Sequence, residues 1–467
     1  MALASMFDGP HASVFTLSTT DSWHIMGVIA VFLVVYSFAL VVHRLWYSPL
    51  AGFPGPKHLA VTSWYETVVD LFSHDFPERL CNMHEKYGPI VRVAPSELHI
   101  NDADYFTTVF AAAASHRTDI IPPRGLGMDD SLGSTTHHDL HQLRRKPLDR
   151  FLSRQNVMRL QGIIHNEIRI LDRMILTAKG KGTAVRLDHA FASFTGDVVG
   201  QVACGESPGL LDGPNFTPEW YTMIRGAAKA IPLLRHFPQI GSVMQCVPAG
   251  LLQKIFPNST GFKILQLLGE KQIARIRTEV DREMKGETEV NSSMFHHLLR
   301  SDIPELEKHP TRLNAEAVSF LGAGTYPTAA TLILTAYYIL ATPNVEDRLR
   351  NELKDVMARF DDEVPNYVDV EQVEYLGACI KEGLRILRLF RRKGRLSADE
   401  DLHYKQWTIP KNTLVTMSPY SLHMDPDVFP DPHQFNPERW LSKDPDPRMD
   451  RNLVPFLKGS RNCIGMK

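Results

Sequence analysis

Close to the end of the chain the sequence reads Phe456-Leu457-Lys458-Gly459-Ser460-Arg461-Asn462-Cys463-Ile464-Gly465. One cysteine is combined here with two glycines, an arginine and an aromatic residue at fixed offsets. Gly459 permits a tight turn and Gly465 a close approach of the backbone, because neither carries a Cβ atom. The combination predicts that Cys463 binds a haem iron as a thiolate, a ligand that favours cleavage of the O–O bond. The alternative for this residue alone is a buried, inert thiol.

The composition of the whole chain is that of a globular protein. Its 467 residues are 43% hydrophobic and 22% charged, with a formal net charge of -2, so the chain can bury a large core. This balance indicates neither a nucleic-acid partner nor an acidic tail. The cysteines are odd in number, widely spaced and without CxxC pairs, which argues against a disulfide scaffold or a zinc site and favours a reducing compartment. They are Cys81, Cys204, Cys246, Cys379 and Cys463.

An uncharged apolar segment occupies positions 25–42 (IMGVIAVFLVVYSFALVV), and its length is close to that needed to span a bilayer. No Lys or Arg precedes Arg44, so the basic region of a cleaved secretory signal is missing and we expect a retained anchor. Basic residues on the C-terminal side place the bulk of the chain in the cytosol. The predicted organisation is a lumenal N-terminus (1–24), a transmembrane anchor (25–42), a Pro-rich hinge (43–57) and a catalytic domain (58–467).

The body of the chain is mainly helical in pattern. Short β-branched runs at 90–93 and 98–100 predict a small sheet early in the body. A loop at 205–218 is either the start of a mobile segment or an ordinary surface loop. Helical periodicity covers the ranges 140–154, 156–177, 262–285, 314–341, 345–360 and 370–389.

Glu382 and Arg385 lie three residues apart in a predicted helix, on one of its faces. Such a pair is usually a solvated ion pair. Downstream, Arg439 in the segment Phe-Asn-Pro-Glu-Arg-Trp supplies a second arginine. We predict a Glu-Arg-Arg network that holds the segment before the cysteine, because buried charges need partners.

Two further groups of residues support a haem site. His141 and Arg145 lie at i and i+4 on one helical face, where both can donate to carboxylates such as haem propionates; the alternative is a basic surface helix. In the long apolar helix, Ala323-Gly324-Thr325-Tyr326-Pro327-Thr328 combines a Gly-Thr pair with a proline. A break in the helix at this point can make room for oxygen and water, and the alternative is a kinked core helix.

Taken together and in this order, these motifs resemble those of the cytochrome P-450 superfamily. The decapeptide matches the family pattern FxxGxRxCxG at every fixed position, and Glu382 and Arg385 match its ExxR. Arg439 matches the arginine that completes this triad. The resemblance implies that Phe456 packs beside the sulfur, and that the haem propionates are held by His141 (in place of the commoner Trp), Arg145, Arg395 and Arg461.

The phrases FPGPK, KYGPIVRVAPSELHI and FPDPHQFNPERW are similar to fungal microsomal members, in particular the trichodiene-oxygenase-like enzymes of secondary metabolism. The resemblance implies one haem domain of the α+β class, mainly helical with small β-sheets. It also implies haem b as cofactor, a separate NADPH-cytochrome reductase as electron donor, and the endoplasmic reticulum membrane as location. The expected reaction is a monooxygenation that inserts one oxygen atom into a lipophilic secondary metabolite, a terpenoid or a polyketide.

The long helix departs from the family pattern. Most members carry an acidic residue and then a threonine after the Ala-Gly pair, and this pair helps to deliver protons to iron-bound dioxygen. Here the two positions hold Tyr326 and Pro327, so Thr325 or Thr328 would have to hold a water instead. This departure leaves open a haem-thiolate isomerase or dehydratase that does not need dioxygen.

Two more departures follow the ExxR helix. A basic run, which is either a solvated face or a receiver for an acidic substrate group, consists of Arg388, Arg391, Arg392, Lys393 and Arg395. The sequence ends at Lys467, whereas similar members continue with a helix on the proximal side of the haem and with strands. The expectation is a C-terminally truncated domain, from an incomplete sequence or as an inactive relative.

Overall fold

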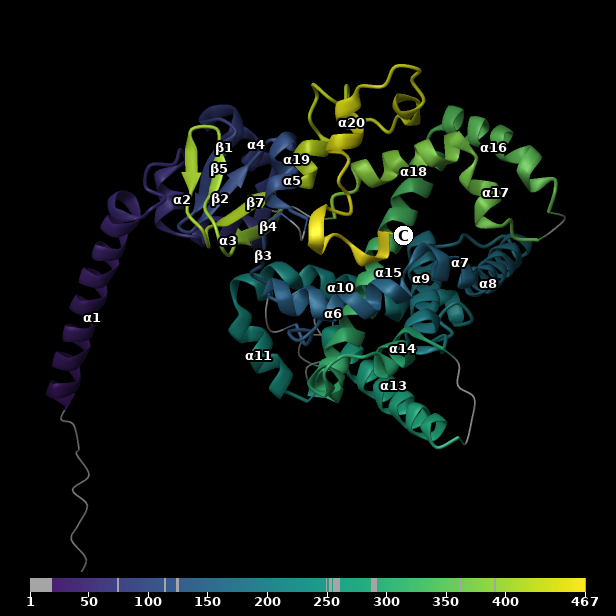
Figure 1. Cartoon of the computed structure of the whole chain (residues 1–467), viewed down its shortest axis with the longest axis horizontal. Coiled ribbons are helices and arrows are strands. Elements are labelled where there is room, and N and C mark those ends of the chain that lie inside the picture. Colours follow the sequence, from purple (N-terminus) through teal and green to yellow (C-terminus); the bar gives the residue numbers. More distant parts are fainter. Residues whose placement is uncertain are drawn as a thin grey trace, which may run out of the picture.

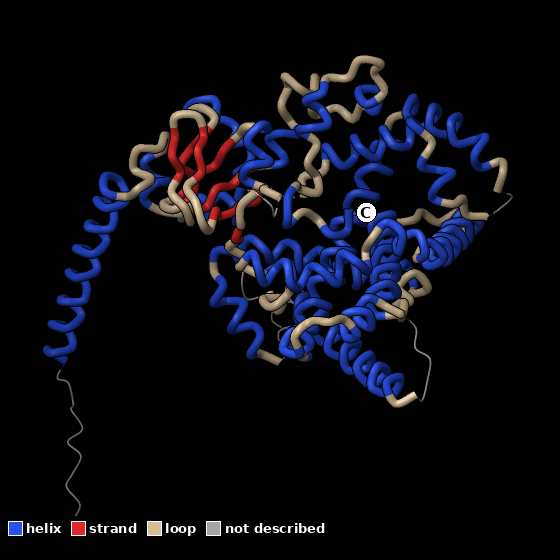
Figure 2. The backbone as a smooth tube through the Cα atoms, viewed as in Figure 1, coloured by secondary structure: helices blue, strands red, loops and turns tan. Residues whose placement is uncertain are grey.

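The computed structural model describes residues 19–73, 75–112, 115–122, 126–248, 250–251, 254, 261–286, 292–360, 363–389 and 392–466. Helices make up most of the body, and the strands gather in one small region at its edge, close to the base of the N-terminal helix α1 (Figures 1 and 2). This is the mainly helical α+β architecture that the sequence predicts. Residues 1–18 of the expected lumenal N-terminus, together with Arg391 and Lys467, lie outside the described residues.

The chain passes through short N-terminal helices and the first strands before it reaches the helical part of the body. The helices of the first half are α1 Thr19–Val42, α2 Lys57–Val61, α3 Trp64–Val68, α4 Phe76–Tyr87, α5 Phe106–Val109, α6 His138–Phe151, α7 Arg154–Arg159, α8 Gln161–Gly180, α9 Leu187–Cys204, α10 Pro218–His236 and α11 Pro238–Cys246. Those of the second half are α13 Gly261–Met284, α14 Met294–Arg300, α15 Pro310–Ala341, α16 Pro343–Met357, α17 Tyr367–Glu371, α18 Glu374–Ile386, α19 Pro419–His423 and α20 Pro447–Asn452.

A five-stranded mixed sheet joins the N-terminal and C-terminal parts of the chain, with strand order β1-β2-β7-β4-β3. β1 pairs antiparallel with β2, β2 runs parallel to β7, and β4 pairs antiparallel with both β7 and β3. A separate hairpin is formed by β5 and β6. The strands are β1 Ile90–Ala94, β2 Glu97–Ile100, β3 Thr118–Asp119, β4 Lys393–Ser397, β5 Leu402–Tyr404, β6 Trp407–Ile409 and β7 Leu414–Met417.

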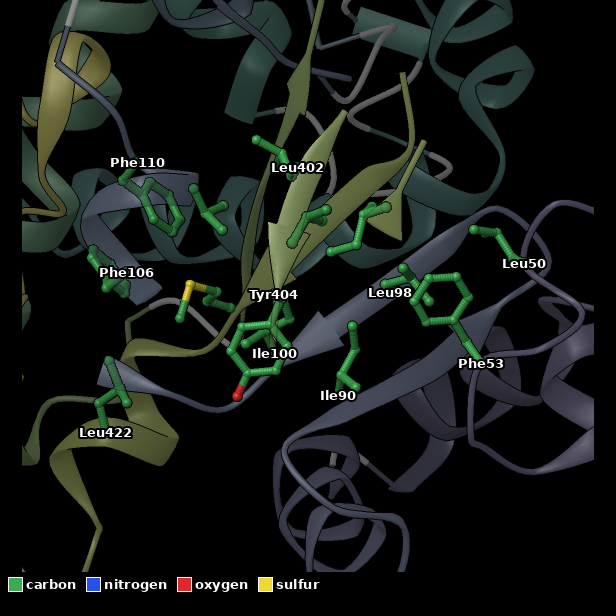
Figure 3. Close-up of a cluster of buried hydrophobic side chains, with 14 of the residues drawn as sticks. Leu50, Phe53, Ile90, Leu98, Ile100, Phe106, Phe110, Leu402, Tyr404 and Leu422 are labelled. Carbon is green, nitrogen blue, oxygen red and sulfur yellow. The ribbon is translucent and has the colours of Figure 1, made fainter. Parts of the chain in front are cut away.

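One hydrophobic cluster covers this sheet (Figure 3), and Val454 and Leu457 of the segment before the cysteine belong to it or pack against it. Leu50 and Phe53 from the Pro-rich connector are buried in it, so the connector is packed against the sheet. Phe106 and Phe110 stack with their ring centroids 4.3 Å apart. Phe110 also links the cysteine loop to this cluster. Its ring lies in the cluster, while its carbonyl and that of Ala111 contact the loop, as described below.

The long helix α15 forms the centre of the helical part, where it packs against α9 and α13. In the contact with α9, the hydroxyl of Thr195 donates to the carbonyl of Thr325 on α15 at 3.3 Å. A Cβ atom on Gly324 of α15 would collide with the side chain of Val199 on α9. Glycine at 324 is therefore required by the packing of these two helices.

Most predicted helices correspond to observed ones within a few residues. The range 156–177 divides into α7 and α8, and 370–389 divides into α17 and α18. Helices α9 and α10 were not predicted, because the small residues of α9 blur its periodicity and Pro232 lies inside α10. The predicted strands correspond to β1 and β2. The predicted loop at 205–218 corresponds to the connection between α9 and α10, which contains one short 3-10 helix, Pro214–Phe216.

Helix α1 contains the predicted anchor segment and extends away from the body (Figure 1). Its described side chains are exposed over nearly the whole length of the helix. Two of the described helices are long and apolar enough to cross a membrane: the N-terminal one, spanning Trp23–Tyr47, and α15. Because α15 packs in the centre of the body, the N-terminal helix is the candidate anchor.

Candidate functional site

The cysteine loop is closed by its own backbone and fixed to the core. The amide of Cys463 donates to the carbonyl of Phe456 at 2.9 Å, and the amide of Ser460 donates to the carbonyl of Ala111 at 2.9 Å. Gly459 adopts φ 77°, in the left-handed region, and a Cβ atom there would collide with the carbonyl oxygens of Phe110 and Ala111. The sequence predicted a tight turn at Gly459, and the structure adds the contacts that require glycine.

Gly465 contributes to the sulfur environment through its backbone. Its φ is -85°, and a Cβ atom would meet only the Sγ of Cys463, at 3.9 Å, which is an ordinary contact. Partial burial raises the pKa of Cys463, whereas the amide of Gly465 and the positive charge of Arg145 act in the opposite direction. Cys463 is nevertheless an exposed residue, and Phe456 nearby is half-buried. The thiol is therefore accessible to a metal that would deprotonate it.

Arg461 ties the cysteine loop to the segment around β3. Its guanidinium donates to the carbonyls of Thr118 at 2.9 Å, Thr135 at 2.6 Å and Thr136 at 2.8 Å. Arg145 on α6 holds the residue next to the cysteine, because its NH1 and NH2 donate to the carbonyl (2.7 Å) and the Oδ1 (2.8 Å) of Asn462. Both arginines thus position the loop, a role that the motifs did not reveal.

His141 and Arg395 complete a buried basic cluster. His141 lies one turn before Arg145 on α6 and is buried with it, so the alternative of a basic surface helix is wrong. The guanidinium of Arg395 lies over the ring of Phe110, 4.7 Å from its centroid. Burial first, and then the positive charges of Arg461, Arg145 and Arg395, lower the pKa of His141 to about 3. Burial and the neighbouring Arg461 lower the pKa of Arg395 to about 9.

This cluster fits a dianionic group bound beside the cysteine. Among the described residues, neither Arg395 nor Arg461 has a carboxylate within ion-pair distance, although both are more than nine-tenths buried. The Nδ1 of His141 is likewise buried without a hydrogen-bond partner in the described part of the chain. Buried positive charge without a counter-ion is costly, so an anionic ligand would relieve the mutual repulsion that lowers these pKa values. The two propionates of haem have the required charge.

Glu382 is the centre of a buried network on α18. Its carboxylate accepts from the Nε and NH2 of Arg385 at 2.9 and 2.8 Å, and from the Nε of Arg439 at 3.1 Å. It also accepts from the indole of Trp440 at 2.9 Å and the amide of Asn436 at 3.1 Å. Trp440 follows Arg439 directly in the sequence, so it could have been predicted as a further partner of Glu382. The Glu-Arg-Arg motif alone does not include it.

The network extends toward the cysteine loop through His423. The NH1 of Arg385 donates to the carbonyls of His423 and Pro432, both at 2.8 Å. The Nδ1 of His423 lies 3.1 Å from the carbonyl of Arg385, and its Nε2 accepts from the amide of Val454 at 3.0 Å. These contacts fix α18, the segment 423–440 and the start of the cysteine segment relative to one another.

The motif in α15 does not break the helix, so the predicted interruption is wrong in that form. The helix is continuous from Pro310 to Ala341 and contains Pro327, which has no N–H to donate to the carbonyl of Ala323. Ala323 and Thr328 are exposed, whereas Thr325 is fully buried and its Oγ1 has no hydrogen-bond partner among the described residues. Of the two threonines considered for holding a water, Thr328 is therefore the one exposed to solvent, whereas Thr325 lines a cavity beside α15.

Two members of the basic run after α18 are paired with glutamates. Arg392 is buried and pairs with Glu66 at 2.6 Å and with Glu97 at 2.9 Å. Arg388 pairs with Glu78 at 2.6 Å. Arg392 is thus buried and not part of a solvated face, whereas Arg388 is exposed, and neither of the two is free to receive an acidic substrate group. Among the described members of the run, Arg395 is the one that joins the cluster beside the cysteine.

A cysteine presented on a fixed turn beside buried His141, Arg395 and Arg461, which have no carboxylate partner among the described residues, is the arrangement expected of a haem-thiolate protein. The profile of the family described as Cytochrome P450 matches residues 54–467. The chain belongs to the cytochrome P450 family. This membership implies a haem iron cofactor and agrees with the helical architecture around the cysteine loop.

Named relatives are fungal enzymes. The chain is 61% identical to the cytochrome P450 monooxygenase sdnH of Sordaria araneosa, over 100% of this chain and 90% of the relative. It is 40% identical to the cytochrome P450 monooxygenase tndB of Aspergillus flavipes, over 95% and 96%. It is 39% identical to the fusicoccadiene C-8 hydroxylase of Phomopsis amygdali, over 91% and 83%. The chain is accordingly a haem-thiolate monooxygenase of the kind found in fungal secondary metabolism.

Proposed function

We propose that this chain oxidises a lipophilic secondary metabolite, a terpenoid or a polyketide, with O₂ and with electrons from an NADPH-cytochrome reductase. The observation that carries the proposal is the fixed presentation of the Cys463 thiol beside buried basic side chains, of which Arg395 and Arg461 have no carboxylate partner among the described residues. An enzyme of this class has only a few polar contacts to its substrate, so the apolar surroundings of α15 support a lipophilic substrate.

In this reaction the residues around the cysteine would have three different roles. Cys463 would hold the iron of haem b through its thiolate, and the bound haem would supply the activation of dioxygen. His141, Arg145, Arg395 and Arg461 would neutralise the propionates, in addition to the loop contacts that Arg145 and Arg461 make. Phe456 would shield the sulfur from water, which favours a stable thiolate bond to the metal.

The oxygen side would be formed by α15. Ala323 is exposed and would face the reacting groups, and Gly324 allows α15 to approach α9. Thr328 is exposed too, but it follows Ala323 by five residues and lies about 140° around the helix from it, so its hydroxyl would hold a water beside this face. Thr325 is buried from solvent but lines a cavity beside α15, and its carbonyl accepts from the hydroxyl of Thr195 at 3.3 Å.

Two observations support the proposed substrate class and location. The name of one relative, fusicoccadiene C-8 hydroxylase, describes oxidation of a diene at one carbon atom. The exposed apolar helix α1 is compatible with an anchor in the endoplasmic reticulum membrane, with residues 25–42 in the bilayer and the body on the cytosolic side. A lipophilic substrate that partitions into a membrane would be concentrated near such an enzyme.

The test is a reduced, CO-bound difference spectrum of the full chain in microsomes, with Cys463→Ala as the variant. We expect the Soret band of thiolate ligation in the wild type and its loss in the variant. The matched control is Cys246→Ala, because Cys246 is exposed on α11 and belongs to no part of the site. A band that persists in Cys463→Ala, or is missing from the wild type, would refute the assignment of the ligand.

A second candidate function is suggested by Tyr326 and Pro327, which replace the acid and the threonine of most members. In this alternative, the enzyme is a haem-thiolate isomerase or dehydratase that rearranges or dehydrates its substrate and consumes no O₂. Turnover assays with and without NADPH and reductase separate the two candidates. Product formation in their absence would favour the second candidate and contradict the monooxygenase.

A further inference from the structure

A cavity of about 320 Å³ lies between α9, α10 and α15. Its walls are mainly apolar and include Ala192, Ile224, Ala330, Ile333, Leu334 and Leu387. The first two come from α9 and α10, the next three from α15, and Leu387 directly follows α18. A cavity of this volume and lining suits a medium-sized hydrocarbon skeleton.

The cavity lies on the same side of α15 as the oxygen motif. Ala330 and Leu334 follow Ala323 by seven and eleven residues, which places the three residues on one face of an α-helix. Tyr326, three residues after Ala323, also lines the cavity. A molecule in the cavity would therefore lie along the face that the proposed reaction uses.

Among the described residues that line this apolar space, Arg225 is the charged one. Arg225 on α10 is exposed, and its guanidinium carbon lies 5.8 Å from the ring centroid of Tyr221, another lining residue. In the described part of the chain no carboxylate lies within ion-pair distance of Arg225, whereas Arg388 and Arg392 are paired with glutamates. A guanidinium at the edge of an apolar cavity is thus available to an acidic ligand.

Further polar side chains of the lining include the phenols of Tyr221 and Tyr326 and the hydroxyl of Thr325. Burial and the neighbouring Tyr221 raise the pKa of Tyr326, so its hydroxyl remains protonated and can donate a hydrogen bond. These side chains and that of Arg225 can therefore all donate a hydrogen bond to an anion. The same arrangement offers no strong acceptor for an amine.

We propose that the cavity selects an amphipathic carboxylic acid, whose carboxylate pairs with Arg225 while its hydrocarbon body fills the apolar space. This inference rests on the proposed function, in which the cavity is the substrate site, and it narrows the lipophilic substrate to an acid. Arg225 is a specificity-determining residue in this proposal. The sequence suggested that an acidic substrate group could bind to the basic run after α18. This proposal places the acidic group at Arg225 instead.

The experiment measures binding of lauric acid and of methyl laurate to the purified, haem-loaded full chain by isothermal titration calorimetry. The two probes share the hydrocarbon chain and differ in the charge of the head group. We expect the acid to bind the wild type about tenfold more tightly than the ester, as for one charge-assisted contact. In Arg225→Met, which keeps an apolar stem of similar length, this preference should disappear, and in Arg225→Lys most of it should return.

The matched control is Lys229→Met, because Lys229 is an exposed cation one turn further along α10 that does not line the cavity. It should retain the full preference for the acid. An equal affinity of the wild type for acid and ester, or the same preference in Arg225→Met as in the wild type, would overturn the proposal. The CO-bound difference spectrum is recorded for the wild type and for every variant. If the wild type shows no Soret band of thiolate ligation, the haem function is refuted, whatever the ratio of the affinities for acid and ester.

Discussion

Replacement of Glu382 by glutamine would remove the charge at the centre of the α18 network while keeping the shape of the side chain. Glu382 is 0% exposed and Arg385 is 1% exposed. Arg439, the second cation on this carboxylate, has a side chain that is 7% exposed. The amide cannot neutralise these two cations, and its NH₂ group would point toward at least one of them. The variant would therefore contain two buried cations without a counter-ion.

The expected loss of stability follows from this burial. Breaking a buried ion pair by removing one partner costs about 3–5 kcal/mol. The total free energy of unfolding of a globular protein is about 5–15 kcal/mol, so the change takes a large share of it. Because the network reaches the cysteine segment through His423 and Val454, we also expect a lower haem content of the purified variant.

The assay is urea unfolding of the wild type and of Glu382→Gln, with haem content measured on the same preparations. The control is Glu78→Gln, because Glu78 pairs with Arg388 at 2.6 Å but the two side chains are 45% and 56% exposed. An exposed pair contributes only about 0–1 kcal/mol. If both variants lose the same free energy of unfolding, the network is not the buried support described here.

Gly459→Ala should lower haem retention strongly, because of its left-handed backbone and the two carbonyls against it, whereas Gly465→Ala should leave the haem-to-protein ratio nearly unchanged; the reverse order would contradict the geometry of the loop. Gly324→Ala should lower the free energy of unfolding by about 1–3 kcal/mol through overpacking, and Val199→Ala in the same chain should recover part of it; purely additive losses would show that the two side chains do not meet. Burial and Arg385 lower the pKa of His423 to about 3, so below pH 6.5 the unfolded chain binds a proton that the folded chain does not. The free energy of unfolding should fall by about 2 kcal/mol from this group between pH 6.5 and pH 5, and His423→Asn should remove this part of the slope; an unchanged slope would contradict the assignment.

Short motifs predicted the parts of the site that lie close together in the sequence. The offsets within the decapeptide identify Cys463 because the loop geometry is set by neighbouring residues, above all by the turn at Gly459. The pair Glu382 and Arg385 could be predicted in the same way, since three residues bring two side chains to one face of a helix. Family membership then supplied the cofactor and the kind of reaction.

Other roles could not be predicted, because they depend on partners that are distant in the sequence. Arg145 and Arg461 were expected at the propionates alone, and the structure shows that they also hold Asn462 and three carbonyls around β3. Gly324 was expected to make room for oxygen, but its lack of a Cβ atom is required by Val199 on another helix. A sequence read along one element does not reveal which side chain packs against it.

The sequence by itself determined the haem-thiolate class, the apolar N-terminal helix and most of the helical ranges, because these depend on local spacing and periodicity. Only the tertiary structure decided which charges are compensated. Arg392 belongs to a basic run in the sequence, yet in the fold it is buried between Glu66 and Glu97. Arg225 carries no motif, yet it stands unpaired by the described residues at an apolar cavity beside α15. The electrostatic role of a side chain is set by its distance from opposite charges and from water, and both distances are products of folding.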